Sequence, residues 1–227
     1  MYWQEDGEAQ ANHRPPEDVF DLAFRIQGKQ LAIDHAFALA SALCDKLDVD
    51  LCSRIGVHQI RVAESGNGWS RPDHDGASML LSKRVRLVIR ANHDDREQLD
   101  RLCGQTLEID GEALRVGENS VRQFSTLDTL FARSVVCDAG QPEEVFLGNV
   151  AAELGSLGIE VKKMLCGTSG LIHTDTAAIF TRSLLVAGLR PHESIALQRH
   201  GIGGQRLLGC GLFVAHKGID AIDDART

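Results

Sequence analysis

Apolar residues in the first half of the chain follow two different spacings. Three stretches have the length and apolar content of strands, at residues 19–26, 57–64 and 83–91. Between the first two stretches, apolar side chains recur at helical spacing as far as Leu47. Asp34 precedes them and is a residue type that can cap the start of a helix. The pattern therefore predicts a strand, a helix and two further strands.

A second helix and a hairpin complete the first half. Residues 93–104 begin with acids and end in Gly104, which is the usual punctuation of a helix. Residues 106–117 surround Asp110-Gly111, a dipeptide typical of a tight hairpin turn. The predicted order in this half is β-α-β-β-α-β.

The second half predicts the same order again. Two helices with proline near the start and glycine at the end are expected at 142–158 and 191–201. Strands are expected at 132–138, 159–167, 178–189 and 206–216. Two such units predict an α+β protein of two tandem ferredoxin-like (βαββαβ) domains, which we place at residues 19–125 and 126–216.

The two ends of the chain differ from these units. Residues 1–18 contain five acids and a Pro-Pro pair, which predicts a disordered acidic leader, and residues 217–227 read as a tail. No apolar run approaches the ~20 residues that cross a bilayer, and the start lacks the apolar core of a signal peptide. We expect a cytoplasmic protein with no membrane contact.

The six cysteines fall singly within apolar stretches. Zinc sites use closely spaced pairs of ligands, and small secreted scaffolds carry a denser cysteine framework. We therefore expect reduced cysteines in the core, with no metal and no cofactor.

The net charge of −8 argues against a general nucleic-acid binder. Its distribution is uneven, because residues 161–214 carry six Lys and Arg against two acids. A basic final third on an acidic protein suits a localised anionic ligand.

Five glycines lie between Gly201 and Gly211, after a predicted helix and before a predicted strand. A dinucleotide fingerprint has the opposite order, so that interpretation fails. Glycines after a helix can expose backbone N–H groups to phosphate oxygens, and Gly209 and Gly211 would leave a bare strip on the last strand. The predicted RNA-backbone contacts are Arg199, His200, Gly203, Gly204, Gln205 and Arg206.

This glycine-rich segment, HGIGGQRLLGCGLFV, resembles the loop of the repeat-associated RNA-binding superfamily of CRISPR systems. It looks like the version in the repeat-processing endoribonucleases, in particular the Myxan-type branch, and residues 31–43 and 102–117 also fit that branch. The resemblance implies binding of CRISPR repeat RNA and metal-independent cleavage by attack of the 2′-OH on the adjacent phosphate. It also implies a monomer or homodimer, with other CRISPR effector subunits as further partners.

The resemblance places the catalytic histidine of that family on His35. A histidine suits proton transfer because its reference pKa of about 6.5 lies near working pH. His35 falls beside Ala38 and Ala42, off the apolar stripe of its helix, so we expect it outside the core. His58 in the next strand could act as the acid to its base, or could be a buried, hydrogen-bonded histidine.

One departure from the family pattern leaves other functions open. Some members assist histidine with a tyrosine, whereas the only tyrosine here is Tyr2 in the leader. A non-catalytic RNA-binding subunit of a CRISPR effector is therefore an alternative. A small-ligand-binding protein with the same tandem fold is another.

Overall fold

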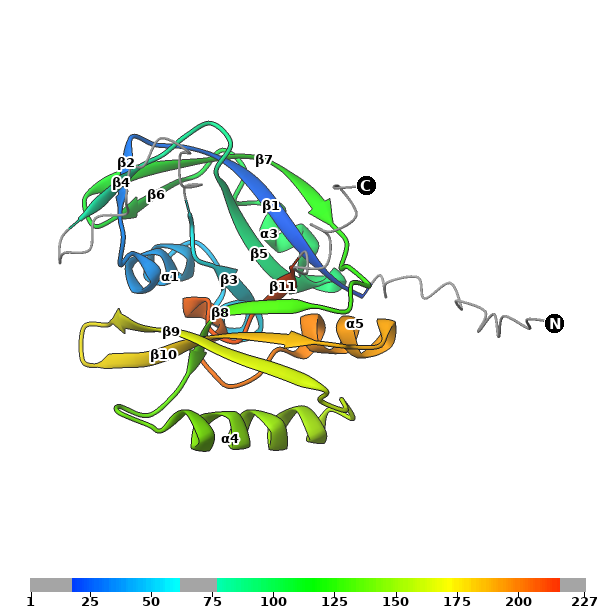
Figure 1. The fold of residues 1–227 in the computed structure, drawn as a ribbon. Helices are drawn as coiled ribbons and strands as arrows, with labels where there is room; N and C mark the ends of the chain where they lie inside the picture. The colour runs from blue at the N-terminus through cyan, green and yellow to red at the C-terminus, as the bar shows by residue number, and fades with distance from the viewer. Residues whose placement is uncertain (1–17, 62–76, 217–227) are drawn as a thin grey trace, which may run out of the picture.

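The computed structural model describes residues 18–61 and 77–216, which form two layered halves (Figure 1). The predicted tail, the predicted leader apart from Asp18, and the end of the predicted strand 57–64 lie outside the described residues. Within those two ranges, no helix is long and apolar enough to cross a membrane.

The N-terminal half is an antiparallel sheet with helices packed beneath it in Figure 1. Its strands are β1 (Val19–Gln27), β3 (Gly56–His58), β5 (Arg86–Asn92), β6 (Thr106–Ile109) and β7 (Glu112–Arg122). Its helices are α1 (Ala36–Cys44), α2 (Val49–Arg54) and α3 (Arg96–Asp100), and β2 (Gln30–Ala32) pairs with β4 (Ser78–Leu80) in a separate ribbon. The strand order β3-β5-β1-β7 is the second, third, first and fourth strand of a βαββαβ unit.

The C-terminal half repeats this topology. Its strands are β8 (Leu130–Val136), β9 (Lys163–His173), β10 (Ala178–Ala187) and β11 (Phe213–Ala215), and its helices are α4 (Glu143–Ser156) and α5 (Pro191–His200). The order β11-β8-β10-β9 is again that of a ferredoxin-like unit, read from the other edge. The prediction of two tandem ferredoxin-like units is confirmed.

Each half has its own apolar core. In the first, Leu39 and Leu43 of α1 are 1% and 0% exposed and pack with strand residues such as Phe24. Burying one such side chain contributes about 1.5–3 kcal/mol. In the second core, α4 and α5 cover one face of the sheet. The opposite face carries no helix of its own half and is turned toward α1 (Figure 1).

A third, smaller cluster joins the two halves. It contains Ala36 and Ala40 of α1, Ile172 of β9, and Leu208 and Cys210 from the glycine-rich segment. The start of α1 and the glycine-rich segment are thus held together at the boundary between the domains.

The strand predicted at 206–216 is largely wrong. Residues 206–208 form a 3-10 turn and only Phe213–Ala215 is a strand, because Gly209 and Gly211 adopt positive φ values of 85° and 67° that a strand does not contain. The helix predicted to reach Leu47 ends at Cys44, and a separate α2 follows it. The hairpin on Asp110-Gly111 is confirmed, with φ of 51° and 80° at its two turn residues.

The expectation of six reduced cysteines is also wrong. Cys44 and Cys52 form a disulfide with Cα atoms 6.0 Å apart, because the chain turns back between α1 and α2. Of the free cysteines, Cys210 is buried, whereas Cys103 is exposed. Burial raises the pKa of Cys210 to about 12.

Candidate functional site

The glycines at the two ends of the segment 201–211 are fixed by close packing. A Cβ on Gly201 would lie 2.3 Å from the carbonyl oxygen of Gly211, and one on Gly211 would lie 1.8 Å from that of Ile202. A Cβ on Gly209 would lie 2.9 Å from the carbonyl oxygen of Val57. The space beside Gly209, where a side chain would otherwise stand, is therefore filled by the main chain of β3.

Gly203 and Gly204 are different, because a Cβ on either would meet no atom within 4 Å. Both are exposed, as is Gln205, which takes the left-handed conformation at φ 62°. The Gly203 N–H donates to the Glu153 carboxylate of α4 at 2.6 Å. This tip already holds an anionic oxygen, as a phosphate-binding nest does.

Two of the predicted basic contacts are occupied within the protein. The Arg206 guanidinium donates to the carbonyl oxygens of His200 and Arg199, and so caps the end of α5. Burial lowers the pKa of Arg206. Arg199 pairs with Asp18, while His200 is exposed.

His35 lies in the core, so the expectation that it stands outside is wrong. Its side chain is 2% exposed, at the residue that precedes α1. Nδ1–H donates to the carbonyl oxygens of Ala32 and Ile33 at 2.8 and 3.1 Å, and Nε2 accepts the Ile60 N–H at 3.0 Å. Burial lowers its pKa, against the opposing effect of the two carbonyl acceptors. The ring is neutral and both nitrogens are engaged.

His58 belongs to a separate polar network. Its Nε2 lies 3.6 Å from Asp21 Oδ1, and the same carboxylate receives Arg90 through bonds of 2.7 and 2.9 Å. Burial favours a raised pKa for Asp21, but His58 and Arg90 outweigh it and hold that pKa well below its usual range. Arg90, 1% exposed, also donates to the Gln198 carbonyl oxygen of α5 at 2.6 Å and so joins the two domains. His35 and His58 therefore take part in different networks.

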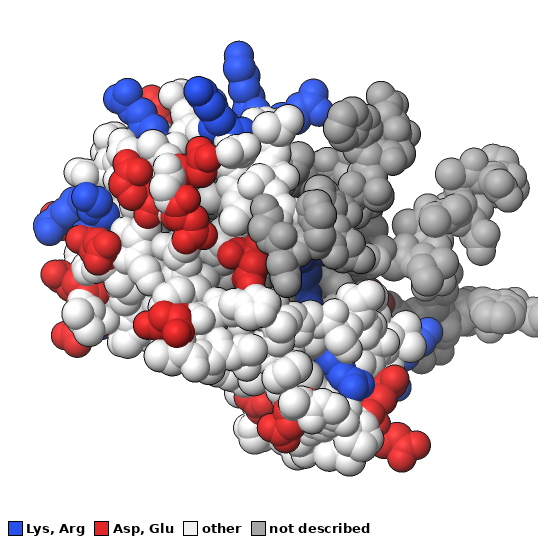
Figure 2. Space-filling model, turned by 90° about the vertical axis from the view of Figure 1, so that its left-hand side faces the viewer, with Lys and Arg blue, Asp and Glu red and all other residues white. Residues whose placement is uncertain are grey.

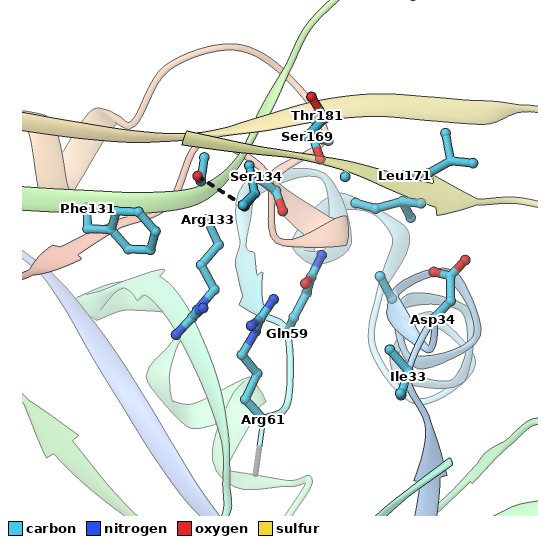
Figure 3. A pocket seen from close by; sticks show the side chains of 15 residues that line it. Ile33, Asp34, Gln59, Arg61, Phe131, Arg133, Ser134, Ser169, Leu171 and Thr181 are labelled. Carbon is cyan, nitrogen blue, oxygen red and sulfur yellow. Dashed lines mark hydrogen bonds between the residues drawn. The ribbon is translucent and has the colours of Figure 1, made fainter. Parts of the chain in front are cut away.

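A cavity of about 250 Å³ lies between the two domains. One wall is the helix-free face of the C-terminal sheet, and the other includes Asp34 and Gln59. Figure 3 shows Arg61 and Arg133 extending into this space from opposite domains. The sheet wall presents hydroxyl side chains from Ser134, Thr168, Ser169, Thr181 and Ser183.

The charge of this cavity suits a phosphate. The two guanidinium groups can neutralise the phosphate and bind its oxygens. The hydroxyl groups can donate hydrogen bonds to neighbouring parts of an RNA backbone. On the face drawn in Figure 2, acidic and basic side chains both lie on the outer surface, and one basic side chain lies recessed between the upper and lower halves. Within residues 18–61 and 77–216, no group of three His, Cys, Asp or Glu side chains could hold a metal ion.

A family model described as Cas6 Crispr matches residues 20–218. The chain belongs to the Cas6 family. The CRISPR-associated endonuclease Cas6 of Myxococcus xanthus (strain DK1622) is 28% identical over 195 residues, which cover 86% of this chain and 80% of that protein.

Two solved structures share the fold of this Cas6-family chain. A CRISPR associated protein Cas6 superposes with a TM-score of 0.60 at 10% identity, covering 88% of this chain and 100% of its own. An RAMP protein binding different RNA substrates gives a TM-score of 0.61 at 13% identity, covering 87% of this chain and 100% of its own. At these identities the likeness shows the fold alone.

The cavity of this Cas6-family chain was missed by sequence reasoning. Arg61 and Arg133 each stand inside a predicted strand, where a charged residue commonly faces solvent. Asp34 was taken only as a helix cap, and its side chain instead pairs with His173. Which residues converge on the cavity depends on how the two domains pack, and no local pattern encodes that.

Proposed function

We propose that this Cas6-family chain is an endoribonuclease that binds CRISPR repeat RNA and cleaves it within the cavity between its domains. The observation that carries the proposal is the pair Arg61 and Arg133, which reach into one space from the two domains (Figure 3). A phosphate bound there would contact both halves of the protein at once.

The proposed reaction is attack of a 2′-OH on the adjacent phosphate, which leaves a 2′,3′-cyclic end. It needs a base near the 2′-OH, a proton for the departing 5′-oxygen, and positive charge on the phosphate. The two arginines can supply that charge, so the scheme requires no metal ion.

The exposed tip of the glycine loop would hold another part of the RNA backbone. Gly203, Gly204 and Gln205 are exposed, and the bond from the Gly203 N–H to the Glu153 carboxylate shows that this main chain can hold an anionic oxygen. Contacts from Arg199, His200 and Arg206 stay predictions, as do a cytoplasmic location, a monomeric or homodimeric state and other effector subunits as partners.

The catalytic roles of His35 and His58 also stay predictions. For His35 to accept a proton from RNA, Nε2 would first have to lose the Ile60 N–H and become accessible. In the arrangement described above, its hydrogen bonds hold the segment 32–35 against residue 60, beside the cavity. That geometry suits a positioning residue.

The test is to incubate the purified chain with a CRISPR repeat RNA. We expect one defined cut, a 2′,3′-cyclic phosphate by mass spectrometry, and an unchanged rate in EDTA. A single 2′-deoxy sugar 5′ of the scissile phosphate should abolish the cut, because the nucleophile is then missing. Cleavage that survives the deoxy substitution contradicts this mechanism.

A non-catalytic RNA-binding subunit is the second candidate. The observation in its favour is that both ring nitrogens of His35 are engaged in the core. Saturable binding of the repeat RNA by the intact chain, without any cut, would establish this second function instead.

A further inference from the structure

His173 lies at the end of β9, where the β9–β10 hairpin reaches the start of α1. The Asp34 carboxylate oxygen Oδ2 accepts two hydrogen bonds from this one residue. Its main-chain N–H donates at 3.0 Å, and its ring Nδ1–H donates at 2.6 Å. Two bonds from one residue to one oxygen fix both the hairpin end and the plane of the ring.

The pairing with Asp34 decides the tautomer of His173. An ionised carboxylate can only accept, so the Nδ1 nitrogen must carry the proton. In the neutral ring Nε2 then has a free lone pair. Among the described residues no hydrogen bond engages Nε2, and the His173 side chain is 57% exposed. This differs from His35, whose Nε2 accepts a main-chain N–H inside the core.

The pair stands at the edge of the interdomain cavity. Asp34 lines that cavity together with Leu171 and Ile172, the two residues that precede His173. Figure 3 shows Asp34 at the cavity edge, across from Arg61 and Arg133. His173 therefore follows directly on two residues of the cavity wall, and a third lining residue, Asp34, fixes its tautomer.

We propose that His173 is the general base of RNA cleavage and that Asp34 is its positioning residue. This inference rests on the proposed function. The 2′-OH proton passes to Nε2 of His173, and the 2′-oxygen forms a bond to phosphorus. The bond between phosphorus and the 5′-oxygen breaks, and the 5′-oxygen takes a proton from a water molecule. The hydroxide formed from that water then takes the proton from the His173 imidazolium, which restores the neutral base. Asp34 holds Nδ1–H throughout and provides the counter-charge to the imidazolium.

The test measures single-turnover cleavage of repeat RNA at saturating protein, with RNA affinity measured in parallel. His173→Ala and His173→Gln should each lower the rate about 100-fold or more, because general base catalysis typically contributes that much. The Gln side chain keeps a donor for Asp34 but cannot take the proton. RNA affinity should stay within about threefold, and added imidazole should partly restore the rate of the Ala variant.

The matched control is His192→Ala, an exposed histidine in the first turn of α5, which should cleave at the wild-type rate. If both His173 variants cut within threefold of wild type, the inference is overturned while the proposed function stands. If wild type makes no cut, the proposed function fails and this inference with it.

A substrate with sulfur in place of the 5′-oxygen separates base from acid. Sulfur leaves without a proton, so a variant that lacks the acid regains its rate on this substrate, whereas one that lacks the base does not. We expect His173→Ala to remain slow on the sulfur substrate. Recovery of the wild-type rate there would overturn the assignment as base.

Asp34 gives the positioning test. Asp34→Asn should lower the cleavage rate about tenfold or more without weakening RNA binding, because the tautomer and the counter-charge are lost together. Asp34→Glu should restore part of the rate by returning the carboxylate. Equal rates for the Asn and Glu variants would contradict a role for the charge.

Discussion

The glycine loop and the interdomain cavity lie next to each other but are built in different ways. The loop, residues 200–211, is one continuous segment whose shape depends on close approaches between its own main-chain atoms. The cavity is assembled from side chains of separate strands and of the segment before α1. Substitutions in the packed part of the loop should therefore lower the free energy of unfolding. Substitutions of cavity residues should instead weaken the binding or cleavage of RNA.

The largest effect is expected for Gly211→Ala. The added Cβ would stand 1.8 Å from the Ile202 carbonyl oxygen, at a φ of 67° that alanine rarely adopts. We expect a loss of about 3 kcal/mol or more in the free energy of unfolding, measured by denaturant titration. The matched control is Gly204→Ala, where the Cβ meets no atom within 4 Å and the change should stay within about 0.5 kcal/mol. Similar losses at both positions would break the division of the loop into a packed part and an open tip.

An intermediate effect is expected for His35→Ala. It leaves the Ile60 N–H and the Ala32 carbonyl oxygen without their partner, at a cost of about 2 kcal/mol in unfolding free energy at pH 7.5.

The same variant should change the dependence of stability on pH. Burial lowers the pKa of His35 in the folded chain, so below the usual value of 6.5 the unfolded chain binds a proton that the folded chain does not. The stabilisation that His35 contributes is complete above pH 6.5 and is lost as the pH falls through the lowered pKa of the folded chain. The difference in unfolding free energy between wild type and His35→Ala should therefore become smaller from pH 7.5 to pH 5. A difference that grows over this range would contradict a neutral buried ring.

A smaller effect, measured as RNA affinity, is expected for Arg61→Ala and Arg133→Ala. Each should weaken repeat-RNA binding about tenfold, or about 1.4 kcal/mol, and should flatten the dependence of affinity on salt. Arg84→Ala removes an exposed cation outside the cavity lining and serves as the control. Equal losses for all three variants would show that only overall charge matters.

Much of the fold follows from local patterns, because its signals are local. Pro142 before α4, the acids in the first turn of α4, and Gly201 after α5 mark helix ends that the structure places within a residue or two. The strand at 206–216 was mispredicted because Leu207 and Phe213 share strand periodicity with the glycines between them. Both glycines take positive φ where the backbone is closely packed, Gly209 against Val57 of β3 and Gly211 against Ile202 of the same loop, and the periodicity does not show these approaches.

The candidate site could be predicted only in part. The glycine motif indicated the family, and the tip Gly203–Gln205 is the exposed part of it. His35 and Asp34 are neighbours in sequence, yet one points into the core and the other toward His173, 139 residues away. The direction in which each side chain points is set by domain packing, so the sequence did not distinguish them.

We expect the scissile phosphate to lie in the interdomain cavity. The direct measurement is photo-crosslinking with a repeat RNA that carries one photoreactive nucleotide next to the cleavage point, followed by mass spectrometry of the labelled peptides. We expect labels within residues 131–134 or 168–173, along the sheet wall of the cavity. Labels confined to residues 200–206 would place the reacting phosphate on the glycine loop and contradict it.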